Sequence, residues 1–307
     1  MKRATQSETH TRRIRGDKRL AAMAQPWRRG WGVSILVLLG LRSAESCCKA
    51  QFIEKYQLKA TALATNVTGL TLDEARRKHV LSAMSFVPPA LFENPSALRL
   101  EFGVRNGHMM NFMSTQPIPL GGADANLGAR SSNVRSVPQY LVPNSAASRP
   151  WDGFDSFRGL PKSTLNAARL GWGGGKYTVK GQLPEVPAHV RLHVGWFNET
   201  LPPFLDTPIG SGPVAFAHLD ADIYTSTIQV LDALCTRCRL RMGTVLAFDE
   251  IFGPPGIHRE EQRALDEATE RCSLQWKFIT FLNHPRTNFG RAAVQITKQP
   301  KCAANLL

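Results

Sequence analysis

The last two strand-like segments of the chain, 275–282 (QWKFITFL) and 291–298 (RAAVQITK), are separated by only eight residues, NHPRTNFG. This loop is too short to hold a crossover helix, so the two segments must pair as an antiparallel hairpin. Upstream of them, strand-like runs alternate with helix-like segments, which is typical of parallel pairing. We therefore expect a mostly parallel sheet that closes with an antiparallel hairpin.

Five further strands precede this hairpin, and helices fit between them. Thr71 and Glu74 stand at capping-box spacing before one helix, and Gly107 precedes another. The pattern predicts an α/β fold with a doubly wound, mostly parallel seven-stranded sheet. The expected strands are 97–104, a segment ending at Asp155, 189–195, 214–220 and 243–249, and two later helices are expected over 226–240 and 258–272.

Composition divides the chain into a leader and one catalytic domain. Residues 1–50 are basic and then apolar, and 51–96 form a helical extension. The catalytic domain is expected over 97–300, interrupted at about 114–150 by a segment rich in Pro, Gly, Ser and Asn with little periodicity. We interpret that segment as an irregular insertion because it is too long for an ordinary connection.

The leader resembles a targeting segment. Its apolar core, Trp31–Leu41, has eleven residues, whereas a membrane span needs about 20. Counted from Met23, it has a short basic stretch, an apolar core and a signal-type cleavage site at Ala44-x-Ser46. Entry into the secretory pathway is favoured; an organelle transit peptide and a short membrane anchor are the alternatives. An uncleaved leader is the one part expected to contact a membrane.

The net charge does not indicate a nucleic-acid partner. The chain has a formal charge of +14, but residues 1–30 alone hold nine Lys/Arg and two acids. The remaining surplus is spread thinly, without a basic helix stripe or a basic patch interleaved with aromatic residues. We therefore expect no nucleic-acid binding.

Cysteines and glycosylation sequons add little to the sequence prediction. Cys235 and Cys238 form a lone C-x-x-C, and a zinc site would need a second pair, so two small buried side chains are favoured. Sequons at Asn66 and Asn198 agree with secretion but are common by chance.

Four acids follow two of the expected strands. Asp220 and Asp222 end "VAFAHLDAD", and Asp249 and Glu250 end "LAFDE". Ligands bind beyond the carboxyl ends of the strands in an open α/β sheet, so the four side chains should gather there. Two such charges about 4 Å apart repel by roughly 1 kcal/mol in water and about 4 kcal/mol at an effective dielectric of 20. The cluster therefore favours a hard divalent cation such as Mg²⁺, with helix caps or solvated rim residues as the alternative.

Two other motifs have the features of a nucleotide-type site. "EFGVRNG" (101–107) has glycines between a strand and a helix, where the backbone approaches ligands closely. Asp155, in "GFDSFRGLP", stands where an acid accepts hydrogen bonds from ribose hydroxyls, although it could simply cap the turn that follows. His218 could orient a ligand, but a core histidine with a backbone partner is favoured.

The ordered motifs "LEFGVRNGHMMNF", "WDGFDSFRGLP", "HVRLHVGWFNETLP", "HLDADIYTST" and "GTVLAFDEIF" resemble the macrocin O-methyltransferase-like family of class I S-adenosylmethionine-dependent methyltransferases. The resemblance covers roughly 97–298 and implies a Rossmann-like methyltransferase fold. It assigns nine positions to the cofactor, from its methionine part through the ribose to the adenine: Glu101, Gly103, Val104, Gly107, Asp155, Ser156, Gly195, Trp196 and Phe197.

The resemblance also implies a mechanism. It assigns a divalent metal, expected to be Mg²⁺, to Asp220, Asp249 and Glu250, and the general base to Asp222. Antibiotic-sugar members of the family carry two aspartates where this chain has Asp249-Glu250. The expected reaction is methylation of a hydroxyl on a small-molecule acceptor, for which a sugar is one candidate. Two alternatives stay open: a glycosyltransferase that uses Asp220-Ala221-Asp222 as a D-x-D metal motif, and a non-catalytic cofactor-binding protein of the same fold.

Overall fold

The computed structural model describes residues 69–116, 150–162, 174–252, 260–283 and 290–298. The leader, the first part of the helical extension and positions 117–149 of the predicted insertion lie outside these residues. Within the described ranges, no helix combines the length and the apolar character needed to cross a membrane.

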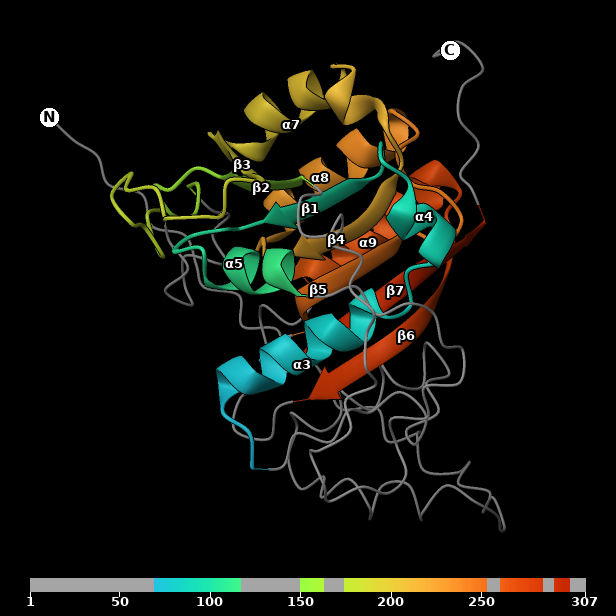
Figure 1. The fold of residues 1–307 in the computed structure, drawn as a ribbon, viewed down its shortest axis with the longest axis horizontal. Helices are drawn as coiled ribbons and strands as arrows, with labels where there is room; N and C mark the ends of the chain where they lie inside the picture. The colour runs from blue at the N-terminus through green and yellow to red at the C-terminus, as the bar shows by residue number, and fades with distance from the viewer. Residues whose placement is uncertain (1–68, 117–149, 163–173, 253–259, 284–289, 299–307) are drawn as a thin grey trace, which may run out of the picture. The chain divides into compact units, whose positions relative to one another are not determined.

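Seven strands form one mixed sheet in the order β3-β2-β1-β4-β5-β7-β6. The first five strands along the chain pair in parallel, whereas β7 is antiparallel to both β5 and β6. The predicted fold class is therefore confirmed: an α/β fold with a doubly wound, mostly parallel seven-stranded sheet and a closing antiparallel hairpin (Figure 1). The strands are β1 (Leu98–Phe102), β2 (Trp151–Asp155), β3 (Val190–Val194), β4 (Val214–Leu219), β5 (Val245–Phe252), β6 (Gln275–Asn283) and β7 (Gly290–Lys298).

Helices cover both faces of the sheet, with a separate apolar core on each (Figure 1). One face carries α7 (Phe197–Leu205), α8 (Tyr224–Thr236) and α9 (Glu260–Cys272). The opposite face carries α3 (Leu72–Met84), α4 (Pro89–Glu93) and α5 (His108–Thr115), and a short 3₁₀ turn, η2 (Ile209–Ser211), precedes β4. This two-sided burial explains why β1 and β4, at the centre of the sheet, are buried along their whole length.

Helix α3 starts at the predicted capping box. The Thr71 hydroxyl accepts from the Glu74 amide at 3.2 Å, and the Thr71 amide donates to Glu74 Oε2 at 2.8 Å. The helix then packs on β5, β6 and β7, with Val80 and Met84 among its buried residues. This segment of the helical extension is therefore anchored directly on the C-terminal part of the sheet.

Two local features differ from expectation. Helix α7 was not predicted, because Pro202 and Pro203 lie inside it and proline lacks the amide that a helix interior uses. Helix α5 continues to Thr115, one residue beyond the expected start of the irregular insertion.

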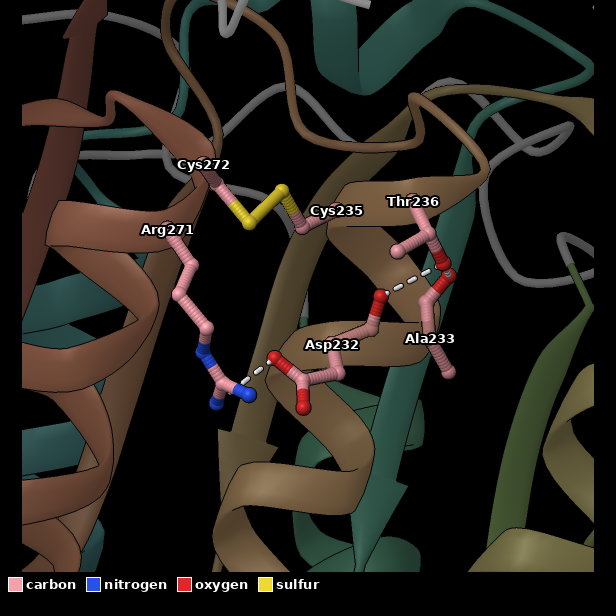
Figure 2. The surroundings of a disulfide bond; sticks show 6 residues. All are labelled: Asp232, Ala233, Cys235, Thr236, Arg271 and Cys272. Carbon is pink, nitrogen blue, oxygen red and sulfur yellow. Dashed lines mark hydrogen bonds and ion pairs between the residues drawn. A yellow bond between two sulfur atoms is a disulfide. The ribbon is translucent and has the colours of Figure 1, made fainter.

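Cys235 and Cys238 are buried, as predicted, but the sequence prediction missed their disulfide bonding. Cys235, at the end of α8, forms a disulfide with Cys272, at the end of α9, across 37 positions of sequence (Figure 2). Beside it, Arg271 forms an ion pair with Asp232 at 2.9 Å. Cys238 is also disulfide-bonded. Helices α8 and α9 are thus joined covalently at one end, a long-range pairing that C-x-x-C spacing does not reveal.

Candidate functional site

A cavity of about 650 Å³ lies at the carboxyl ends of the parallel strands. Its wall includes Gly103 after β1, Asp155 at the end of β2, Gly195 after β3, Asp220 after β4 and Asp249 on β5. A cavity of this size falls within the ordinary range for small-molecule and cofactor sites. Its position is the one expected for ligand binding in an open α/β sheet.

Six of the nine predicted cofactor residues line the cavity. Glu101 and Val104 instead lie buried beside it, and Gly107 begins α5 with its Cα facing Pro184. The six lining residues are Gly103, Asp155, Ser156, Gly195, Trp196 and Phe197. The structure brings this group together, while its assignment to a cofactor stays a prediction.

Gly103 follows β1 and lies against the backbone that follows β4. Its φ is +96°, and a Cβ at this position would lie 2.1 Å from the Asp220 carbonyl oxygen. Both the backbone conformation and the space exclude a larger side chain. The glycine therefore lets the two strand ends that flank the cavity come together.

Asp155 is held in place by backbone amides. Its Oδ1 accepts from the Phe157 amide at 2.6 Å, and its Oδ2 accepts from the Arg105 amide at 2.7 Å. Burial raises the pKa of Asp155, and these two hydrogen bonds oppose the rise. Since a carboxylate offers about four lone-pair sites, Asp155 can still accept hydrogen bonds from a ligand.

The four predicted acids, from the end of β4 and from β5, all line the cavity, and a guanidinium group lies between two of them. Arg76, from α3, donates from Nε to Asp249 Oδ1 at 2.9 Å and from Nη2 to Asp220 Oδ2. Arg291, on β7, holds Asp249 from the other side, with Nε 2.9 Å from Oδ1 and Nη2 3.2 Å from Oδ2. The positive charge between Asp220 and Asp249 thus comes from the protein itself.

His218 adds a third positive group beneath these acids. Its Nδ1 lies 3.3 Å from Glu101 Oε1, and its Nε2 lies 3.8 Å from Asp249 Oδ1, too far for a hydrogen bond. Burial alone would lower the pKa of His218, but the two carboxylates raise it to about 9. The favoured prediction of a core histidine with a backbone partner was wrong about the partner, because both ring nitrogens face carboxylates.

Asp249 is therefore firmly ionised. Burial alone would raise its pKa, but Arg291, Arg76 and His218 outweigh burial and hold the pKa well below its ordinary value. The Arg76 guanidinium is likewise locked in its charged form, since Asp220, Asp249 and Glu101 outweigh burial and raise its pKa.

Asp222 and Glu250 differ from these paired acids. Both line the cavity, and neither carboxylate has an ion pair or hydrogen bond with any residue that the structure describes. Burial first, and then the neighbouring carboxylates, raise both pKa values well above the ordinary range. Asp222 also has a φ of +61°, a left-handed conformation that is uncommon for residues other than glycine but that aspartate adopts more often than most. Buried, unpaired carboxyls with raised pKa values are typical of functional groups.

Two glutamates at the start of α9 position the backbone of these strand ends. Glu261 Oε1 accepts from the Ala221 amide at 3.3 Å, and Oε2 accepts from the Glu250 amide at 3.1 Å. Glu260 accepts from the Tyr224 amide at 2.8 Å. One buried carboxyl thus connects the segment carrying Asp222 with the segment carrying Glu250.

The structure gives the predicted Mg²⁺ site no support. Among the described residues, no group of three or more His, Cys, Asp or Glu side chains is placed to hold a metal. Asp220 Oδ2 and both carboxylate oxygens of Asp249 already accept from guanidinium groups. In this arrangement, the predicted ligands Asp220, Asp249 and Glu250 do not fit a divalent cation.

Sequence reasoning missed Arg76, Arg291 and Glu261. Arg76 lies 144 positions from Asp220 and 173 from Asp249, so nothing local connects them. Arg291 offered a weak signal, an arginine just before the apolar run Ala292–Val294. Glu261 follows another glutamate at the start of a helix pattern, so it resembles an ordinary solvated helix start.

Comparison with known proteins gave structural matches of low similarity. No protein-family model matches the chain, and no curated protein matches it. It is similar in structure to the calicheamicin methyltransferase CalS11, with 19% identity, a TM-score of 0.44, and coverage of 88% of this chain and 99% of that one. The O-methyltransferase NovP gives 19% identity and a TM-score of 0.44 over 73% of this chain and 80% of that one. We therefore argue the function from the site itself.

Proposed function

We propose that the protein is an S-adenosylmethionine-dependent methyltransferase that methylates a hydroxyl group of a small-molecule acceptor. The observation that carries the proposal is that two kinds of residue line the same cavity. Gly103, Asp155 and Trp196 line it together with the carboxyls of Asp222 and Glu250. A nucleoside cofactor would use the first group, and an acceptor that must lose a proton would use the second.

The residues present fit the adenosyl cofactor. Asp155 stands at the end of β2 with lone pairs for ribose hydroxyls, and Trp196 and Phe197 supply aromatic surface beside it. Gly103 keeps the backbone after β1 free of a side chain. The bound cofactor would supply a sulfonium methyl group as the electrophile.

Asp222 is the proposed general base. With the cofactor bound, the Asp222 carboxylate would take the proton of the acceptor hydroxyl as its oxygen accepts the methyl group and the sulfur leaves as a neutral thioether. The products would be a methyl ether, a neutral thioether and a protonated carboxyl. The raised pKa makes Asp222 a stronger proton acceptor than an ordinary aspartate. Positioning of the two reactants in the cavity supplies much of the acceleration.

No step of this proposal uses a divalent metal, because two of the three residues predicted to bind one, Asp220 and Asp249, are paired with Arg76 and Arg291. The same pairing counts against the glycosyltransferase alternative, which needs Asp220 as a metal ligand. An acceptor that is a sugar remains compatible with the proposal.

We further propose that the protein works in an oxidising compartment, which agrees with the favoured secretory localisation. The Cys235–Cys272 disulfide supports this, since such bonds persist mainly outside reducing cytosol. Asn198, in the second sequon, is exposed on α7. N-terminal sequencing of the mature protein tests the localisation: an intact Met1 would contradict cleavage of a signal peptide.

The function is tested by ligand binding and by product analysis. S-adenosylmethionine should raise the melting temperature of the purified protein, whereas UDP-sugars should not. Incubation with extracts should then yield a product heavier by one methyl group in place of hydrogen, dependent on the cofactor. Stabilisation by UDP-sugars alone would favour the glycosyltransferase alternative, and stabilisation by the cofactor without any product would favour a non-catalytic binding protein.

A further inference from the structure

Arg76 belongs to an element outside the sheet that carries the acids. Helix α3 packs on β5, β6 and β7, and the Arg76 side chain reaches from it to the cavity wall. There its Nε and Nη2 contact carboxylates from two neighbouring strand ends, Asp249 on β5 and Asp220 after β4. One guanidinium therefore bridges the two acids from which the sequence predicts a metal site.

The position of this guanidinium is fixed by the packing of its helix. Ala75 and His79, on either side of Arg76 in the helix, are fully buried, and the capping box fixes the first turn. The Arg76 side chain is 23% exposed, against 42% for Arg77, which pairs with Asp73 at the surface. Arg76 is thus oriented into the acid cluster, and its immediate neighbour is not.

The surrounding charges also favour a protein cation at this point. Asp249 already accepts two hydrogen bonds from Arg291, and His218 lies beneath it. A divalent ion entering between Asp220 and Asp249 would meet all three positive groups at close range. Removal of the Arg76 side-chain charge would instead leave carboxylate oxygens of Asp220 and Asp249 facing the space that the guanidinium had filled. Hard cations bind oxygen ligands of this kind.

We propose that Arg76 is the resident cation of the acid cluster, and that it holds Asp220 and Asp249 in place so that Asp222 faces the acceptor without a divalent metal. The proposal rests on the proposed methyl transfer for the role of Asp222. Arg76 is in this sense a positioning residue that acts through the two aspartates.

Metal binding provides the direct test. Mn²⁺ is titrated into metal-free protein and followed by calorimetry and by electron paramagnetic resonance. The wild-type protein should bind no stoichiometric Mn²⁺ at this site. Arg76→Met, which keeps a long side chain and removes the charge, should gain one Mn²⁺ site with affinity raised by about tenfold or more, because a close positive charge is gone. The gain should disappear in the double variant Arg76→Met/Asp220→Asn.

Matched variants separate the charge from its position. Arg77→Met removes the neighbouring arginine of the same helix and should gain no Mn²⁺ site. Arg76→Lys keeps a positive charge but cannot contact both aspartates as the guanidinium does. It should therefore gain no Mn²⁺ site, and it should retain more activity than Arg76→Met. The melting temperature of each variant shows separately whether it is folded.

Two outcomes would overturn the inference. One is stoichiometric Mn²⁺ binding by the wild-type protein that Asp220→Asn abolishes. The other is a folded Arg76→Met variant that gains no Mn²⁺ site. An activity assay adds a separate readout: a chelator should leave the wild-type rate unchanged, whereas Mg²⁺ should partly restore Arg76→Met. Because Mn²⁺ titration needs no acceptor, failure of the proposed function, seen as absence of cofactor binding, is distinguished from failure of this inference.

Discussion

The cavity wall contains a backbone-held group, Gly103 and Asp155, and a charged group, Asp220 and Asp249, and the two groups are held in place by different means. The backbone fixes the first group: two amides donate hydrogen bonds to the Asp155 carboxylate, and Gly103 lets two strand ends approach each other. Charged side chains fix the second group, since arginines from α3 and β7 form ion pairs with Asp220 and Asp249. The backbone-held group depends on main-chain amides and on the close approach of two strand ends, and the charged group depends on ion pairs between side chains. Substitutions in the two groups should therefore affect different properties of the protein, such as turnover or cofactor affinity.

The largest expected effect separates chemistry from cofactor binding. Asp222→Asn keeps the size of the side chain and removes the base, so turnover should fall by about 10²- to 10⁴-fold. Cofactor affinity, measured by calorimetry, should stay close to the wild-type value. Asp155→Asn is the matched variant in the backbone-held group. It should lower the affinity for the cofactor, but at saturating cofactor it should retain more turnover than Asp222→Asn. Near-full activity of Asp222→Asn would refute the base assignment.

Gly103→Ala should disturb the backbone-held group of the cavity wall. The positive φ costs roughly 1–3 kcal/mol for a residue other than glycine, and overpacking against the Asp220 carbonyl costs about 1–3 kcal/mol more. Both the free energy of unfolding and the cofactor affinity should fall. Gly175→Ala is the control, because Gly175 has a φ of +84° and nothing lies within 4 Å of the place that its Cβ would take. Equal losses in the two variants would mean that the close approach at Gly103 has no importance of its own.

The disulfide joins the C-terminal ends of α8 and α9, and α9 carries Glu261, which contacts the acid-bearing segments from the start of the helix. Cys235→Ser/Cys272→Ser should lower the free energy of unfolding by about 2–4 kcal/mol, since a loop of this length is no longer closed in the unfolded chain. Urea denaturation of the double variant measures the loss, and Cys238 is left unchanged in it. A double variant as stable as the wild type would show that the non-covalent packing of α8 on α9 is sufficient.

A smaller effect concerns pH. Burial and the carboxylates of Asp220 and Asp249 raise the pKa of Glu261 to about 8, although the Glu250 and Ala221 amides oppose the rise. The folded state then holds this proton more tightly than the unfolded state does. Its contribution to stability is complete below about pH 4.3, the value for an ordinary glutamate, and is lost as the pH rises to about 8.

Glu261→Gln should remove this contribution to the pH dependence. The free energy of unfolding of the wild type, relative to the variant, should decline between about pH 4.3 and 8. Urea denaturation at a series of pH values measures the difference. If it stayed constant over that range, Glu261 would titrate alike in the folded and unfolded states.

Much of the fold followed from the sequence because its signals are local. The short 283–290 loop required a hairpin, the Thr71–Glu74 spacing marked the start of α3, and the alternation of apolar runs indicated the strands. Helix α7 was missed because proline usually ends a helix, although Pro202 and Pro203 are accommodated here. Local propensity describes an average, and packing against β2 and β3 overrides it in this case.

The candidate site was predicted only in part. Its acids stand at the ends of predicted strands, so Asp220, Asp222, Asp249 and Glu250 were expected to lie close together, and all four line the cavity. The cation beside them was expected to be a metal, because repulsion between the acids indicates that a positive charge is needed but not which group supplies it. The guanidinium of Arg76 belongs to a helix whose docking depends on tertiary packing, and no spacing rule connects it to β4 or β5.

The Cys235–Cys272 bond also decides how this protein would respond to a protease. A single backbone cut anywhere between these two cysteines would leave both fragments covalently attached until a reductant is added. One fragment would carry Asp220 and Asp222, and the other would carry Arg291. Nicked protein would therefore migrate as an intact chain in a non-reducing gel, with both parts of its charge cluster still present in one molecule.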